Sequence, residues 1–389
     1  MSVDISAACF PVEFSLEEMT SSESTIEKKP LAKTILVIRY RFIGDTILTV
    51  PFLRNLRAAY PHARIDVLTG PKSGEVLDGC PYIDSQIIYD TTRFHKYDSG
   101  SGKARSFASY VLQLRQPKYD LVFVLKRSLS SSLLAFLTGA KRRVGYAMKG
   151  KGQLLRNLLL TDKVAWREDI HEVDSLLSVL EAVGIAVPQE KRALESWVTA
   201  SELATVNDLG LLAPLQAASK KMVLIHAAAA HPDKLYPLAS WAALIKRLHS
   251  ELDLVPVFSG DTQDMALYEE LAALSGLQSV AINFAGLLSL RESMALYSLM
   301  SLAVCVDSGP AHLCAAAQVP TIAIFGPTDP VRWQPYGEAN TAVFYSTLPC
   351  RPCNYHKVCH NRECLTELSP DLIFEKCLNV YRPVLKREQ

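Results

Sequence analysis

From Thr34 onward the sequence alternates between short apolar runs rich in β-branched residues and longer amphipathic stretches with helical spacing. Runs that are apolar on both faces are typical of parallel strands, because the connections between such strands lay helices over the sheet. The pattern therefore predicts an α/β fold. The strands that it predicts lie at residues 34–39, 64–69, 120–125 and 143–146, and then at 222–226, 254–258, 303–307 and 321–325.

The alternation pauses between about residues 186 and 220, and a fresh strand pattern begins at Met222. A chain of 389 residues is long enough for two domains with separate cores. We therefore expect two Rossmann-like domains, at 33–200 and 221–389, with a linker at 201–220 and parallel sheets facing across a cleft. The Ser/Glu/Thr-rich beginning, within residues 1–32, predicts a disordered tail. Ligands should bind beyond the carboxyl ends of the strands.

Composition narrows the class and the setting of the protein. Apolar residues make up 49% of the chain, charged residues 21%, and the formal net charge is +1, so no global feature points to nucleic acid. No apolar run reaches the roughly 18 residues that a membrane span needs. The N-terminal residues lack the pattern of a secretory signal, and nine cysteines are an odd number that favours a reducing compartment. We expect a cytoplasmic protein.

The first strand is joined to the first helix by the segment Arg39-Tyr40-Arg41-Phe42-Ile43-Gly44-Asp45-Thr46. Gly44 permits a tight turn, and Asp45 falls at the expected helix N-cap, where an Asp ordinarily accepts hydrogen bonds from free N–H groups. The functional alternative is that this carboxylate, at the carboxyl end of a strand, serves as a general base. Pro51 lies inside the following helical pattern and predicts a kink.

In the second half, a strand runs into a helix through Asp307-Ser308-Gly309-Pro310-Ala311-His312. Gly309 and Pro310 suit the turn and the first helical position, where free N–H groups and the helix dipole favour a pyrophosphate. His312 lies one turn into the helix, within reach of the same anion. A capped helix with a buried histidine explains the pattern equally well.

A lysine stands in the loop Asp233-Lys234-Leu235-Tyr236-Pro237, after the first strand of the second half. A lone loop lysine is ordinarily solvated. At the carboxyl edge of the sheet, however, the ammonium of Lys234 could neutralise the charge that develops on a departing diphosphate.

Two further clusters have open interpretations. Cys350 and Cys353 have metal-ligand spacing, but Cys359 and Cys364 are more loosely spaced than in a zinc ribbon, so structural zinc, a disulfide pair and free thiols all remain open. Residues 121–161 contain no Asp or Glu. This stretch is either a solvated face or a surface for an anionic acceptor such as a phosphorylated glycolipid or membrane headgroups. Its cations are Lys126, Arg127, Lys141, Arg142, Arg143, Lys149, Lys151 and Arg156.

Several signatures are missing from the sequence. It has no Asp-x-Asp, the usual metal–diphosphate anchor of metal-dependent sugar transfer, and no Gly-x-Gly-x-x-Gly of a dinucleotide site. Gly152 stands where a phosphate-binding loop needs Ser or Thr for magnesium, and the segment His171-Glu172-Val173-Asp174 lacks the second histidine of a zinc protease. We therefore expect no required cofactor or catalytic metal.

Taken together, the motifs resemble those of glycosyltransferase family 9, the ADP-heptose:lipopolysaccharide heptosyltransferases. The similar segments run in the family's order from about residue 33 to 370, which makes the set more specific than any one motif. They are Ile35 to Arg39 with Gly44-Asp45-Thr46 to Pro51, then Lys234-Leu235-Tyr236-Pro237 with Trp241, then Asp307-Ser308-Gly309-x-x-His312, then Phe325-Gly326-Pro327-Thr328-Asp329-Pro330, and finally Cys350-x-x-Cys353 to Leu368-Ser369-Pro370.

This resemblance implies a GT-B fold whose first domain binds the acceptor and whose second domain binds the nucleotide sugar. It also implies inverting, metal-independent transfer of heptose from ADP-L-glycero-D-manno-heptose to the inner core of lipopolysaccharide or a related glycolipid, at the inner face of the plasma membrane. Asp45 would be the base, and Lys234 would stabilise the leaving ADP. The donor-binding positions would be Ala228, Ala229, Asp264, Leu288, Asp307, Ser308, Gly309 and His312. The acceptor-binding positions would be Arg39, Arg41, Lys126, Arg127 and Arg143.

The sequence departs from the family pattern in an N-terminal tail that is longer than typical and at two further places. The loop His226-Ala227-Ala228-Ala229-Ala230 has alanines where members often carry hydroxyl side chains, and Tyr236 replaces a more usual Trp. Three alternatives therefore stay open: a family member with a different nucleotide sugar, a sugar-nucleotide epimerase on the same fold, and a glycan-binding protein that has lost the chemistry.

Overall fold

The computed structural model describes residues 32–90, 106–150, 152–355, 359 and 361–387 of the chain. From Ala32 onward the chain forms one compact unit. The expected N-terminal tail lies, except for Ala32, outside the described residues.

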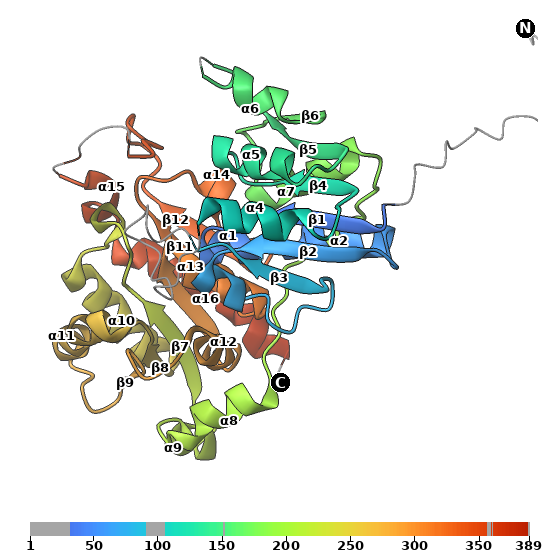
Figure 1. Ribbon diagram of the computed structural model, residues 1–389. Helices are drawn as coiled ribbons and strands as arrows, with labels where there is room; N and C mark the ends of the chain where they lie inside the picture. The colour runs from blue at the N-terminus through green and yellow to red at the C-terminus, as the bar shows by residue number, and fades with distance from the viewer. Residues whose placement is uncertain (1–31, 91–105, 151, 356–358, 360, 388–389) are drawn as a thin grey trace, which may run out of the picture. The chain divides into compact units, whose positions relative to one another are not determined.

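Two six-stranded parallel sheets organise the protein (Figure 1). The first has the order β3-β2-β1-β4-β5-β6 and the second the order β12-β11-β10-β7-β8-β9, so both halves follow the same doubly wound topology. The first sheet consists of β1 (Thr34–Ile38), β2 (Arg64–Thr69), β3 (Ser85–Ile88), β4 (Leu121–Val124), β5 (Arg142–Ala147) and β6 (Asp162–Ala165). The second consists of β7 (Lys221–His226), β8 (Leu254–Phe258), β9 (Ile282–Asn283), β10 (Leu302–Val306), β11 (Thr321–Phe325) and β12 (Thr341–Phe344).

Helices connect the strands of each sheet. The first half contains α1 (Ile43–Ile47), α2 (Val50–Ala59), α3 (Pro71–Glu75), α4 (Phe107–Arg115), α5 (Leu129–Leu137), α6 (Leu154–Leu158) and α7 (Glu172–Ala182). Next come α8 (Ala200–Asp208) and α9 (Ala213–Ala217), followed by α10 (Leu238–Leu252), α11 (Met265–Ser275), α12 (Leu290–Ser298), α13 (Gly309–Ala316), α14 (Pro330–Trp333), α15 (Glu363–Thr366) and α16 (Pro370–Arg387). Among the described residues, no helix is both long and apolar enough to cross a membrane.

The strand predictions are confirmed, since each predicted strand is present with ends that differ by at most one residue. The structure adds β3, β6, β9 and β12, which all lie at the edges of the two sheets. The segment at 201–220, where the sequence predicts a linker without strands, is largely helical and contains most of α8 and all of α9.

Helices cover both faces of each sheet. In the first half, α2 and α7 bury their apolar side chains on one face, and α4 and α5 on the other. In the second half, α12 and α13 cover one face, whereas α10, α11 and α16 cover the other. One buried cluster includes side chains of α2 and α7 together with side chains of α12 and α13. The two halves therefore share a continuous apolar core on these faces.

The segment after β1 corrects two local predictions. The predicted helix is split into α1 and α2, with Pro51 in the first turn of α2, so the kink prediction is confirmed. Phe42 is the N-cap of α1 and Asp45 is its third residue, so the prediction that Asp45 is the N-cap was wrong. Gly44 lies inside α1 rather than in a tight turn. Position 44 needs a glycine because α1 packs closely against the second half there.

Candidate functional site

The first turn of α1 in the first half packs against the first turn of α13 in the second half. A Cβ atom built on Gly44 would lie 2.7 Å from Cδ2 of His312, and one built on Gly309 would lie 3.3 Å from Cγ2 of Ile43. Only a residue without a side chain leaves room for the first of these contacts. Because β1 and β10 are central strands, this junction joins the carboxyl edges of the two sheets where ligands of such folds bind.

On the side of the first half, the carboxylate of Asp45 is held by two donors. Its Oδ1 accepts a hydrogen bond from Nη2 of Arg39 at 2.7 Å, and its Oδ2 accepts one from the backbone N–H of Phe42 at 2.9 Å. The Asp45 side chain is 18% exposed, while that of Arg39 is 4% exposed. Asp45 thus accepts a hydrogen bond from a free N–H at the start of the helix, as a capping residue does. Its carboxylate also reaches solvent, as a general base must.

On the side of the second half, Lys234 is paired rather than freely solvated. Its Nζ lies 2.7 Å from Oδ2 of Asp307 and donates to the backbone carbonyl of Asp307 at 3.0 Å. The hydroxyl of Thr328 donates to the same carboxylate oxygen. The side chain of Lys234 is 21% exposed, whereas that of Asp307 is 7% exposed. A buried carboxylate therefore fixes a partly exposed ammonium at the junction.

Helix α13 begins as the sequence predicts, with Gly309 and Pro310 in its first turn and Ser308 as the N-cap residue. The Ser308 side chain does not cap the helix, because its hydroxyl donates to the carbonyl of Val306 at 3.1 Å. His312 is buried, and burial lowers the pKa of His312 to about 4, against the opposing effect of Asp307. His312 is thus neutral at pH 7, and its Nδ1 has no hydrogen-bond partner among the described residues.

The remaining predicted donor residues lie in other loops of the second half. The carboxylate of Asp264 accepts a hydrogen bond from the backbone N–H of Asp261 at 3.0 Å, and burial raises the pKa of Asp264. Ala228 is buried, Ala229 is half-buried, and Leu288 packs against the shared apolar core. Tyr268 ties these loops together, since its hydroxyl accepts from the N–H of Ala227 and donates to the carbonyl of Ser259.

The predicted acceptor residues fall into two groups. The Nζ of Lys126 lies 5.1 Å from the ring centroid of Tyr40, and burial, reinforced by Arg39, Arg41 and Arg127, lowers the pKa of Lys126 to about 8. The charge of Asp45 opposes that shift, so Lys126 lies within electrostatic reach of Asp45 and of the three arginines. Arg143 makes other contacts: its Nε donates to the carbonyl of Leu159 at 2.7 Å, and its guanidinium lies over Phe136.

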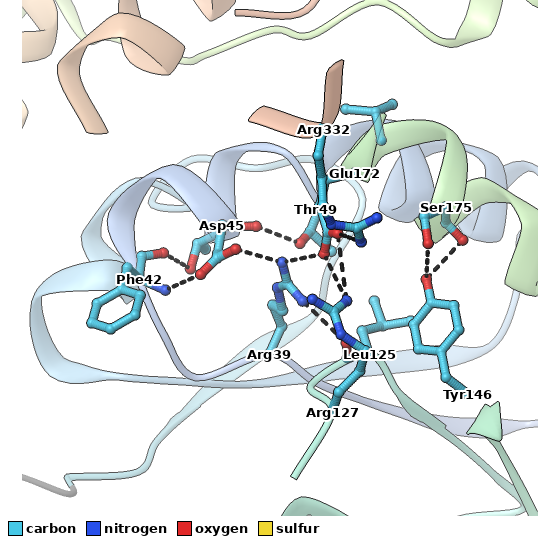
Figure 2. A network of polar contacts seen from close by, with 12 residues as sticks. Arg39, Phe42, Asp45, Thr49, Leu125, Arg127, Tyr146, Glu172, Ser175 and Arg332 are labelled. Atoms are coloured by element: carbon cyan, nitrogen blue, oxygen red, sulfur yellow. Dashed lines mark hydrogen bonds and ion pairs between the residues drawn. The ribbon is translucent and has the colours of Figure 1, made fainter. Parts of the chain in front are cut away.

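The sequence did not reveal a buried charge network behind Asp45 (Figure 2). Its centre is Glu172, the first residue of α7, which is fully buried and accepts hydrogen bonds from Arg39, Arg127 and Arg332. An acidic residue is common in the first turn of a helix, because its negative charge interacts favourably with the positive end of the helix dipole. The sequence at Glu172 therefore carries no signal that distinguishes this carboxylate from an ordinary exposed one.

The cysteine segment does not form a disulfide between any two of Cys350, Cys353, Cys359 and Cys364, which are all free thiols. Cys350 and Cys359 are exposed, and Cys364 is buried. Across the part of the chain that the structure describes, no three His, Cys, Asp or Glu side chains are grouped to hold a metal ion. Residues 356–358 and 360 of this segment lie outside the described part.

Comparisons with known proteins agree with this fold and these motifs. Residues 108–364 match the model of Glycosyltransferase family 9 (heptosyltransferase). The chain is 30% identical over 317 residues to lipopolysaccharide heptosyltransferase 3 of Escherichia coli, a match that covers 80% of this chain and 89% of the relative.

Two solved structures share the fold. A glycosyl transferase family 9 protein from Veillonella parvula DSM 2008 has a TM-score of 0.74 at 21% identity, with 90% of this chain and 97% of that chain covered. The ADP-heptose LPS heptosyltransferase II of Escherichia coli has a TM-score of 0.70 at 22% identity, with 92% and 100% covered.

Proposed function

Because the chain belongs to glycosyltransferase family 9, the heptosyltransferases, we propose that it transfers heptose from ADP-L-glycero-D-manno-heptose to the inner core of lipopolysaccharide or a related glycolipid. The fold is of the GT-B type seen in solved heptosyltransferases. The contact between α1 and α13 carries the mechanistic part of the proposal, since Asp45 and the Lys234–Asp307 pair flank it. The family match begins after Asp45, so the role of Asp45 rests on this geometry.

In the proposal, the second half, at 221–389, binds the donor. The first-turn N–H groups of α13 receive no side-chain cap from Ser308, so they can donate to the diphosphate, which the helix dipole also favours. Lys234 would share its ammonium between Asp307 and a phosphate oxygen of ADP. His312 is neutral at pH 7 and therefore would contribute a hydrogen bond rather than a charge. The other loop residues, Ala228, Ala229, Asp264 and Leu288, would line the rest of the nucleotide-sugar site.

The transfer itself requires one proton acceptor and one stabilised leaving group. An acceptor hydroxyl oxygen forms a bond to the anomeric carbon, on the face opposite ADP, and its proton passes to Asp45. The bond from that carbon to the β-phosphate oxygen breaks, and its electron pair leaves with ADP. A carboxylate is a weak base toward a sugar hydroxyl, so Asp45 acts late, when the hydroxyl has become acidic. Lys234 and the α13 N–H groups stabilise the new phosphate charge, which makes a metal unnecessary.

The first half, at 33–200, would bind the acceptor, with Arg39, Arg41, Lys126 and Arg127 near its hydroxyl. Arg143 is tied to the α5 side, where α5 and α6 contact each other. These two helices expose large apolar side chains: Leu129, Leu133 and Phe136 on α5, and Leu154, Leu155 and Leu158 on α6. Cations without any acidic residue surround them in the sequence at 121–161. Such a surface suits the inner face of an anionic membrane that presents a lipid-linked acceptor.

The test is a transfer assay in which the product is detected by mass. We expect the purified chain to add one heptose to a heptose-deficient core acceptor from ADP-heptose, at the same rate with and without EDTA. A panel of other nucleotide sugars tests the donor, and incubation of ADP-heptose without acceptor tests epimerisation. Turnover only with another donor, conversion of the free donor, or a requirement for added metal would each contradict the proposal.

A further inference from the structure

Glu172 brings three arginines from separate parts of the chain to one buried point (Figure 2). Its Oε1 accepts a hydrogen bond from Nη2 of Arg39 at 2.8 Å and a longer one from Nη1 of Arg127 at 3.4 Å, while its Oε2 accepts one from Nη2 of Arg332. Arg39 follows β1, Arg127 follows β4, and Arg332 belongs to α14 in the second half. The carboxylate of Glu172 has no exposed surface.

Electrostatics explains why these side chains can share one site. Burial by itself would raise the pKa of Glu172, but Arg39, Arg127 and Arg332 together hold that pKa below its usual value. The carboxylate is therefore ionised. Without it, three guanidiniums would repel one another where little water screens them. Glu172 is the charge that lets the three arginines meet.

The network reaches the base of the proposed reaction through one guanidinium. Nη2 of Arg39 donates to Oδ1 of Asp45 at 2.7 Å and also to Oε1 of Glu172 at 2.8 Å. Nη1 of Arg39 donates to the carbonyl of Leu125 at 3.0 Å, which fixes the plane of the group. The orientation of Asp45 thus depends on Arg39, and that of Arg39 depends on Glu172.

The same carboxylate reaches the second half through Arg332. Nη1 of Arg332 donates to the carbonyl of Arg167 at 3.1 Å, and its guanidinium lies 3.8 Å from the ring centroid of Trp166. A neighbouring contact also joins the two halves, since Nε2 of His171 lies 2.8 Å from the backbone carbonyl oxygen of Gln334. Helix α14 follows the loop that contains Thr328, whose hydroxyl binds Asp307. The short segment from Thr328 to Arg332 therefore connects a residue that binds Asp307 to a residue that binds Glu172.

We propose that Glu172 is a positioning residue that orients Asp45 through Arg39 while Arg332 ties this arrangement to the second half. The inference rests on the proposed role of Asp45 as the base. The base would then be correctly oriented only when the second half is seated against the first. A misplacement of about 1 Å at such a site lowers a rate by about 100-fold.

Two variants interrupt the network at different points. Glu172→Gln removes the shared charge, and we expect kcat to fall about 100-fold while the KM for the donor changes little. Arg332→Ala removes the tie to the second half and leaves Arg39 and Arg127 opposite Glu172 and Asp45, so it keeps the folded protein even if Glu172→Gln does not. We expect a smaller loss of kcat for Arg332→Ala, of about 10-fold.

Arg291→Ala is the matched control. Arg291 also reaches from the second half into the first, where its guanidinium donates to the backbone carbonyls of Glu75 and Trp197. It also pairs with Glu202 of the connecting segment at 2.7 Å, and it has no contact with Arg39 or Asp45. Arg291→Ala therefore removes a comparable contact between the two halves and leaves the network around Glu172 intact. We expect the control to keep transfer rates close to those of the unaltered protein.

Two measurements separate positioning from general damage. In an Asp45→Asn background, Glu172→Gln should cost almost nothing more, because its effect passes through Asp45. Hydrogen–deuterium exchange of α1 should be faster in Glu172→Gln and Arg332→Ala and unchanged in Arg291→Ala. An undiminished loss in the Asp45→Asn background, or α1 exchange that does not change, would overturn the inference. Because exchange needs no substrate, it tests the network even if ADP-heptose is not the donor.

Discussion

The two halves of the protein share one strand order but place opposite charges at their carboxyl edges. In the first half a partly exposed carboxylate, Asp45, is held by the buried Arg39. In the second half a partly exposed ammonium, Lys234, is held by the buried Asp307. In both pairs the group at the surface is the one assigned to the chemistry, and the buried partner holds it. The topology thus sets where a charged pair lies, while the loop sequence sets its sign.

The supports behind the two pairs differ. Arg39 is fixed by a second buried carboxylate, Glu172, which itself holds two more arginines. Asp307 has, besides Lys234, the neutral hydroxyl of Thr328. The proposed base, Asp45, is therefore fixed by charge on several sides, whereas Lys234, in the proposed reaction, would exchange part of its contact with Asp307 for a phosphate. The rigid side would keep the proposed base, Asp45, aimed at an acceptor hydroxyl, and the adaptable side would let Lys234 follow the departing diphosphate.

The largest expected effect comes from neutralising the first pair. Asp45→Asn can still accept the hydrogen bond from the N–H of Phe42, but it cannot take a proton, so we expect kcat to fall about 1,000-fold. Asp84→Asn is the control, because Asp84 also pairs with an arginine, Arg57, and accepts a backbone N–H. Initial rates by mass detection decide the matter. A loss of less than about 10-fold for Asp45→Asn would remove Asp45 as the base.

Removing the ammonium of the second pair should have the next largest effect. Lys234→Ala deprives the departing diphosphate of a cation, and we expect kcat/KM for the donor to fall about 100-fold. Lys220→Ala is the control, because it breaks the exposed pair of Lys220, the last residue of the connecting segment, with Asp253 of the second half, and it should leave the rate unchanged. Equal rates for both variants would show that the second half does not use its charge as the first half does.

The comparison of the two sheets also shows what the sequence could predict. Every predicted strand is an inner strand of its sheet. The four strands that the sequence did not predict are the edge strands β3, β6, β9 and β12. An inner parallel strand is buried on both faces and reads as a continuous apolar run, as β10 does. An edge strand is partly exposed, as β6 is with the sequence DKVA, so its pattern resembles that of a loop.

Of the candidate site, the sequence likewise predicts some parts and not others. Motifs in the loops after central strands located Asp45, Lys234 and Asp307, because topology brings those loops together. The contacts of Glu172 with Arg39, Arg127 and Arg332 could not be predicted, since their sequence separations carry no local pattern. The sequence predicts a tight turn at Gly44, whereas in the structure the glycine makes room for the side chain of His312, which lies far along the chain.

A smaller effect is expected where the two halves touch. Gly44→Ala would place a methyl group 2.7 Å from Cδ2 of His312, so either the ring or α1 must shift, and we expect a loss of about 2 kcal/mol in the free energy of unfolding. Gly309→Ala would place a methyl group no closer than 3.3 Å to Cγ2 and 3.4 Å to Cβ of Ile43, which needs only a small shift, and it should cost less than about 1 kcal/mol. Urea denaturation measures both. The reverse order would mean that the junction is looser on the side of the first half.

The smallest expected effect is on the free energy of unfolding at acidic pH, where the two halves should respond differently. Burial lowers the pKa of both His226 and His312, in the second half, to about 4. The unfolded chain protonates these histidines near pH 6.5 but the folded chain only near 4, so their stabilising contribution is present at pH 7 and is lost as the pH falls between those values. From pH 7 to 5.5 each should cost about 1 kcal/mol.

The charged network of the first half should behave differently. The pKa of Glu172 is held below its usual value, so its contribution is present above that value and is lost only at lower pH. Urea denaturation of the unaltered protein and of His226→Gln at pH 7 and 5.5 separates the two ranges, because the variant should lose about 1 kcal/mol less stability over this interval. If both proteins lost the same amount, acid would be acting on groups other than His226, and the predicted contribution of this buried histidine would be wrong.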